Sequence, residues 1–77
     1  MRDVAEYPAP FDPFDVLPLG KGVLRTRLHG LMRAELLGMI GNYNLNPAQK
    51  NLSRLTDSQL VTFIVTAVEV QAVQGRH

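Results

Sequence analysis

The sequence predicts a small all-α domain, residues 20–77, that follows an extended arm over residues 1–19. Two observations point to this fold class. From position 21 onward, apolar residues recur at steps of three and four, which is the spacing of one face of an α-helix. Two sequence signals for the start of a helix follow after position 45. Four of the five prolines, which disfavour helix interiors, lie before position 19. The length of 77 residues suits a single domain of this kind.

The arm is expected to be extended and free of helix, because proline fixes φ and pushes the preceding residue away from helical conformations. It nevertheless carries aromatic side chains, which disordered tails usually lack. A proline-stiffened segment loses little entropy on docking, so its large apolar side chains are candidate contacts for a partner. These candidates are Tyr7, Phe11, Phe14 and Leu17. Three states are open for the arm: folded back on its own domain, docked on another chain, or disordered.

The apolar periodicity predicts two helices in the next segment, at about residues 21–29 and 31–43, with a break at Gly30. A second row, made of small residues, runs beside the apolar one. Its members are Gly30, Ala34, Gly38 and Gly41. An interior glycine costs about 0.5–1 kcal/mol relative to alanine. The row therefore marks either a close approach of another backbone or a weakly constrained surface.

Two capping signals predict the remaining helices. The sequence NPAQ fits the N-cap and first turn of a short helix at about residues 47–53. Thr56 followed by Gln59 fits a capping box, which predicts a last helix at about residues 57–73. That helix is apolar around most of its circumference, so it needs more cover than a single neighbouring helix supplies.

Composition argues against several classes of protein. The chain has no cysteine and two histidines, so we expect neither a disulfide nor a protein-only metal site of the usual zinc kinds. No signal peptide is evident at the N-terminus. The longest apolar-rich stretch, residues 60–73, is shorter than the roughly twenty residues of a membrane span. We therefore expect a soluble, cytoplasmic protein without a cofactor.

Catalysis requires polar groups that converge on one site, and the sequence offers no such pattern. His29 is expected on a solvated basic face, while Ser53 and Ser58 fit helix caps without a histidine nearby in the sequence. The GKG sequence at positions 20–22 lacks the spacing of a phosphate-binding loop. The chain is therefore not expected to be an enzyme.

The net charge of +1 hides an uneven distribution. Residues 1–20 carry one basic and four acidic side chains, whereas residues 21–54 carry six basic and one acidic. Arg25, His29 and Arg33 follow at four-residue steps and are expected on one helical flank. Five cations are candidates for phosphate contacts: Arg25, Arg27, Arg33, Lys50 and Arg54. The plainer alternative is a solvated face that keeps the protein soluble.

The segment RAELLGMIGNYNL…KNLSRLTDSQLVTFIVTA, residues 33–67, resembles the small helix–loop–helix domains at the N-terminus of Rho transcription terminators and, more loosely, SAP and LEM-like modules. Comparable positions are Glu35, Leu36, Leu45, Leu52, Arg54, Leu55, Leu60, Val61 and Ile64. The resemblance covers about half of the chain and implies a compact helical unit that binds nucleic acid or another protein. Nucleic-acid-binding relatives place lysine or arginine where this chain has Thr56, Asp57 and Ser58. An anion there opposes phosphate binding, so the resemblance supports the fold more than a function.

Three hypotheses for the function follow. The first is a non-enzymatic interaction module, an accessory or assembly subunit that docks on a larger protein through its arm and its apolar helical surface. The second is a nucleic-acid-binding helix–loop–helix module that uses the basic middle segment. The third is a homo-oligomerising structural protein in which the last helix pairs across a two-fold axis.

Overall fold

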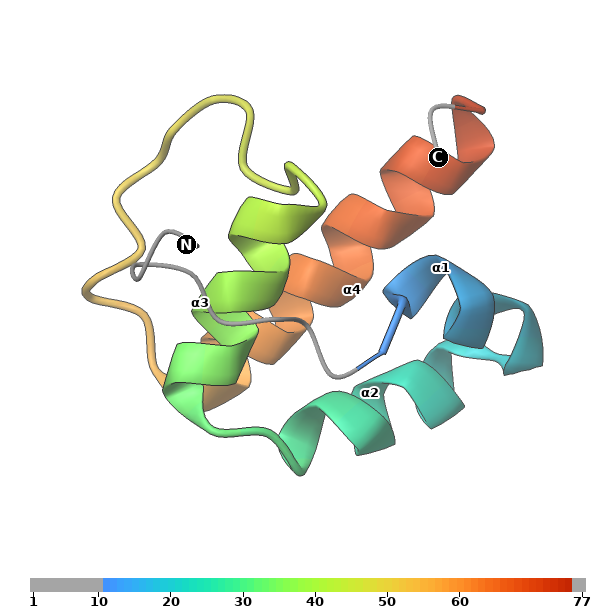
Figure 1. Ribbon diagram of the computed structural model, residues 1–77, viewed down its shortest axis with the longest axis horizontal. Helices are drawn as coiled ribbons and strands as arrows, with labels where there is room; N and C mark the ends of the chain where they lie inside the picture. The colour runs from blue at the N-terminus through green and yellow to red at the C-terminus, as the bar shows by residue number, and fades with distance from the viewer. Residues whose placement is uncertain (1–10, 76–77) are drawn as a thin grey trace, which may run out of the picture.

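The computed structural model describes residues 11–75, which form a helical bundle without strands (Figure 1). Its elements are α1 (Pro13–Val16), the 3₁₀ turn η1 (Leu17–Leu19), α2 (Lys21–His29), α3 (Arg33–Asn42) and α4 (Asp57–Val73). A long irregular loop, residues 43–56, connects α3 to α4. The predicted all-α fold class is confirmed.

Helix α4 begins at the predicted capping box. The hydroxyl of Thr56 accepts a hydrogen bond from the backbone N–H of Gln59 at 3.1 Å, and Oε1 of Gln59 accepts one from the backbone N–H of Thr56 at 2.8 Å. Two of the donors that every helix start leaves unpaired are thereby satisfied. The predicted range of residues 57–73 agrees with the observed Asp57–Val73.

Helices α2 and α3 are separate, as the break at Gly30 predicts. The predicted range of residues 21–29 matches α2, whereas α3 begins at Arg33 rather than at position 31. The later start has a local cause: the carboxylate of Glu35 accepts a hydrogen bond from the backbone N–H of Met32 at 2.9 Å and so makes Met32 the N-cap.

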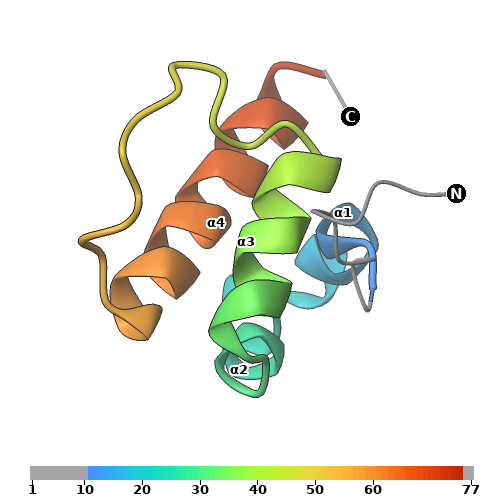
Figure 2. The ribbon, with the colours of Figure 1, turned by 60° about the vertical axis from the view of Figure 1, so that its left-hand side comes forward.

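The core forms where α2 and α3 pack on α4, and α1 also contacts α4 (Figure 2). Its buried apolar residues are Phe14, Val16, Leu24, Leu28, Leu36, Met39, Ile40, Leu45, Leu60, Val61, Ile64, Val65 and Val68. Five of them lie on α4, which makes α4 the central helix. Among residues 11–75, no helix has the length and apolar character needed to cross a membrane.

Residues 13–19 are helical, so the predicted extended arm is wrong for this part of the chain. Asp12 is the N-cap of α1, and its carboxylate accepts a hydrogen bond from the backbone N–H of Phe14 at 2.8 Å. Pro13 occupies the first helical position, where its missing N–H is not needed and its fixed φ suits the helix. Phe14 then enters the core with 8% of its surface exposed.

The helix predicted at about residues 47–53 is absent, and the chain there is irregular. The Asn46 side chain donates from Nδ2 to the carbonyl of Lys50 at 2.9 Å and accepts at Oδ1 from its N–H at 3.0 Å. These bonds close a local loop in place of a helical turn. Gln49 has φ = +56°, in the left-handed region, which a right-handed helix cannot include.

The row of small residues makes no close contact with another backbone segment at Gly30 or at Gly41. A Cβ at Gly41 would have no heavy atom within 4 Å beyond its own helix backbone and chain neighbours. A Cβ at Gly30 would meet the carbonyl oxygen of Arg27 at 3.4 Å. At these positions the described part of the chain fits the expectation of a weakly constrained surface.

Candidate functional site: a groove beside α4

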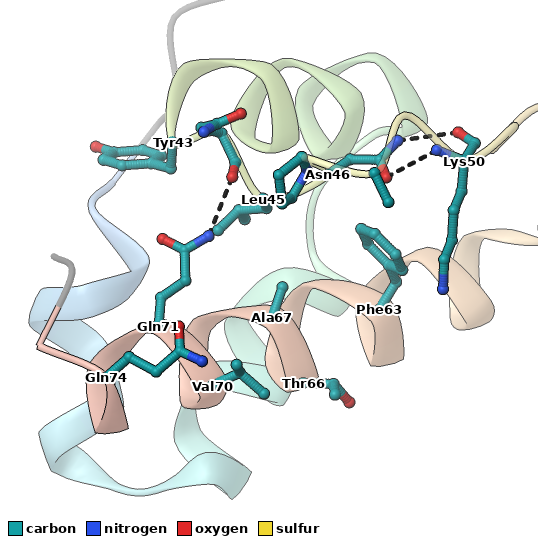
Figure 3. A pocket seen from close by; sticks show the side chains of 13 residues that line it. Tyr43, Leu45, Asn46, Lys50, Phe63, Thr66, Ala67, Val70, Gln71 and Gln74 are labelled. Atoms are coloured by element: carbon teal, nitrogen blue, oxygen red, sulfur yellow. Dashed lines mark hydrogen bonds between the residues drawn. The ribbon is translucent and has the colours of Figure 1, made fainter.

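A groove of about 590 Å³ runs along one face of α4 and is walled on its other side by the loop that follows α3 (Figure 3). We call it the α4 groove. It is lined by loop residues 43–48 and 50 and, on α4, by Phe63, Thr66, Ala67, Val70, Gln71 and Gln74. Its volume lies in the range of about 300–1,000 Å³ that is usual for binding pockets.

The floor of the groove is apolar because α4 places apolar residues there at helical spacing. Phe63, Ala67 and Val70 follow at steps of four and three, so they share one helix face. Phe63 and Ala67 are half-buried, whereas Val70 is 48% exposed. Val73, one step further along α4, is 88% exposed. Val73 does not line the groove and lies on the side of α4 that carries Thr62 and Glu69.

The loop wall is held in place from both of its ends. A left-handed residue, Asn44 with φ = +52°, follows the end of helix α3, and the N–H of Leu45 donates back to the carbonyl of Ile40 at 2.9 Å. Nε2 of Gln71, on α4, then donates to the carbonyl of Asn44 at 3.0 Å. The two bonds between Asn46 and Lys50 fix the next turn. The wall of the groove is thus held by hydrogen bonds within the chain itself.

Arg33 fixes the second half of the same loop. Its Nη1 donates to the carbonyl of Leu55 at 2.7 Å, and its Nη2 donates to the carbonyls of Ser53 at 3.2 Å and, with a longer bond, of Leu52 at 3.4 Å. Nη1 also lies 3.1 Å from the carboxylate of Asp57. The planar guanidinium offers five donors in a fixed fork, which suits several carbonyls at once. The sequence predicted Arg33 as a phosphate contact and gave no signal for this role.

The groove is nearly uncharged. Lys50 is the one ionisable cation in its lining, and no carboxylate lines it. Tyr43 lies at the opposite end and packs against Phe14, with the ring centroids 6.1 Å apart. Burial, with the nearby carboxylates of Asp12 and Asp15, raises the pKa of the Tyr43 phenol above its ordinary value of 10.0. The phenol is therefore neutral at physiological pH, and the surface suits apolar and hydrogen-bonding ligands.

The predicted partner contacts of the arm lie in different places. Phe14 is buried, and Phe11 and Leu17 are half-buried against the core, so these three side chains cover their own domain. The alternative in which the arm folds back therefore describes residues 11–19. Tyr7 lies outside the described residues.

The five predicted phosphate contacts are divided among several elements. Nη1 of Arg25 donates to the hydroxyl of Thr62 on α4 at 3.1 Å, and Arg33 binds the loop. The expectation that these two share a helical flank is wrong, because they lie on separate helices. Arg27, Lys50 and Arg54 are exposed, and nucleic-acid binding stays a prediction that rests on them. Among residues 11–75, no cluster of three metal-ligating side chains occurs.

Comparison of the chain with protein-family models, with curated proteins and with solved structures finds no match. The resemblance to Rho-terminator and SAP-like domains accordingly stays a prediction.

Proposed function

We propose that this protein is a non-enzymatic interaction module that docks on a larger protein through the α4 groove. One observation carries the proposal: the apolar floor of the groove is left uncovered by the described chain, with Val70 48% exposed and Phe63 and Ala67 half-buried. Apolar side chains that gather at the surface of a small domain are typical of protein-binding sites.

The shape of the site favours a helix or a short extended segment as the part of the partner that binds. A groove walled by one helix and one loop resembles the sites in which an amphipathic helix lays its apolar face. The wall is already fixed by the hydrogen bond from Gln71 to Asn44 and by the bonds between Asn46 and Lys50. Docking therefore orders little additional chain, and less of the binding free energy is lost to entropy.

Polar groups at the rim supply specificity. Gln71 and Gln74 lie toward one end of the groove and Lys50 lies toward the other (Figure 3). Asn44 lies beside Gln71, which donates a hydrogen bond to its carbonyl. A partner that forms hydrogen bonds with these side-chain amides and with the Lys50 ammonium binds more tightly than one that buries the same groups unpaired. An apolar core with such a rim is the usual anatomy of a protein interface.

Replacement of Val70 by glutamate tests the proposal. Tagged wild-type protein captures candidate partners from a native cell extract, mass spectrometry identifies them, and calorimetry with the purified partner measures the dissociation constant. We expect Val70→Glu to weaken binding at least about tenfold, because it places a charge on the apolar floor.

The matched control is Val23→Glu, which changes charge equally at a valine on α2 that is 38% exposed and does not line the groove. Circular dichroism verifies that both variants are folded. Equal dissociation constants for the wild type and Val70→Glu would rule out the groove as the docking site.

A further inference from the structure

We propose that the α4 groove also accepts α4 of a second copy of this chain, so that the protein forms a weak two-fold dimer. The inference rests on the proposed function, because it names one occupant of the same surface. In this dimer the two α4 helices run antiparallel. Val70, at the exposed edge of the groove floor, lies in the groove of the other copy.

The face of α4 has the shape that self-pairing needs. In a two-fold interface a patch meets itself, so the patch must carry both a ridge and a hollow. Here Val70, the exposed edge of the groove floor, is the ridge, and half-buried Phe63 and Ala67 form the hollow beside it. An antiparallel arrangement centred between Ala67 and Val70 sets each Val70 against the Ala67 of the other copy. The small side chain of alanine allows the two helices to approach to about 8–10 Å.

The charges on α4 also favour a second copy. The two acidic residues of the helix are paired elsewhere: Asp57 with Arg33 at 3.1 Å and Glu69 with Lys21 at 3.5 Å. Both side chains thus face neighbours within their own chain, and the groove lining contains no carboxylate. Two copies of this face can meet without repulsion between anions.

Lys50 favours antiparallel over parallel pairing of the two α4 helices. It lies near Phe63, at the end of the groove opposite Gln74 (Figure 3). Antiparallel pairing brings Lys50 to the C-terminal end of the other α4, whose last turn carries no basic residue. A helix C-terminus favours a cation because its free carbonyls are partially negative. The two Lys50 residues then lie at opposite ends of the interface, where salt screens their repulsion.

The expected dimer is weak because the shared surface is one helix face and one loop. Interfaces that bury less than about 1,200 Å² in total are typical of transient association. The groove holds one helix at a time, so the second copy and the larger partner exclude each other. Dissociation of the dimer then precedes docking on the partner.

Sedimentation equilibrium of the full chain tests the inference. We expect the average mass to rise from 8.6 kDa toward twice that value as the concentration increases from about 10 µM to about 1 mM. Val70→Glu should remain monomeric over this range, and Lys50→Glu should raise the dissociation constant about threefold to tenfold, while Lys50→Arg and Val23→Glu behave like the wild type. In ¹⁵N spectra, the signals of Ala67 and Val70 should shift on dilution and that of Val23 should not.

The possible results separate the two proposals. A wild-type chain that remains monomeric at about 1 mM overturns the dimer, and so does a dimer that Val70→Glu leaves intact. Partner binding that needs Val70 in a protein that never dimerises overturns the self-pairing alone. A dimer that needs Val70, together with partner binding that does not, overturns the docking site alone.

Discussion

Arg33 is the side chain that holds the irregular loop against the helices. The loop has no helix or strand in which its carbonyls could be paired, and buried or half-buried backbone groups need partners. The guanidinium supplies donors for the carbonyls of Leu55, Ser53 and Leu52, and two of these residues pack against the core. The ion pair with Asp57 is exposed to solvent and contributes less. The hydrogen bonds from Arg33 to the loop carbonyls therefore account for most of the stability that Arg33 contributes.

We expect Arg33→Lys to lower the free energy of unfolding by about 1–2 kcal/mol, since an ammonium cannot reach several carbonyls in a plane. Urea denaturation followed by circular dichroism measures the change. The control Arg27→Lys alters an exposed arginine of α2 and should shift the free energy by less than about 0.5 kcal/mol. Equal midpoints for the two variants would mean that Arg33 does not hold the loop.

At the scale of elements, the loop of residues 43–56 is the part of the chain that departs most from regular structure. It makes two left-handed turns at residues other than glycine, Asn44 and Gln49. Asparagine tolerates that conformation, whereas glutamine does so at a cost. The bonds between Asn46 and Lys50 hold Gln49 in this strained state. Gln49 does not line the α4 groove, so relief of the strain should stabilise the fold without rebuilding the groove.

We expect Gln49→Gly to raise the free energy of unfolding by about 0.5–1 kcal/mol, because glycine enters the left-handed region freely. For a domain of this size the melting temperature should rise by about 2–8 °C. The neighbouring Ala48 does not have positive φ, so Ala48→Gly should lower stability or leave it unchanged. A Gln49→Gly variant that melts below the wild type contradicts the assigned strain.

At the scale of the whole molecule, α4 is covered on three sides by the other helices and open on the fourth. Helices α2 and α3 pack on two sides, and α1 with Phe14 packs on a third. The fourth side is the α4 groove with Val70, and Val73 is exposed beyond the groove. A chain of this size has little surface left with which to cover its central helix, since small domains bury a modest fraction of their surface.

The α1 segment should therefore be essential to stability. We expect Phe14→Ala to cost about 3–5 kcal/mol, which approaches the total stability of a small domain. Phe14→Leu should cost about 1–2 kcal/mol and remain measurable by denaturation. Leu19→Ala is the control, because Leu19 is 62% exposed on the same segment. Equal stabilities for Phe14→Leu and Leu19→Ala would mean that α1 is not part of the core.

The α4 side of the groove could be predicted in large part from the sequence, but the loop side could not. The excess of apolar residues on residues 57–73 predicted that this helix has more surface than one neighbour covers, and Val70 and Val73 are part of that surface. The wall depends on Gln71 reaching Asn44, which lies 27 residues earlier in the sequence. No local sequence pattern predicts such a contact, because a glutamine on a helix surface usually faces solvent.

The sequence alone determined the ranges of α2 and α4 and the all-α class, since periodicity and capping act over a few neighbouring residues. Tertiary structure decided the helical turn at Pro13, the loop in place of a helix after Asn46, and the role of Arg33. Proline at position 13 fits both an extended chain and a helix start, so packing of Phe14 decides between them. Arg33 reaches a carbonyl 22 residues away, and only the folded chain brings these two groups together.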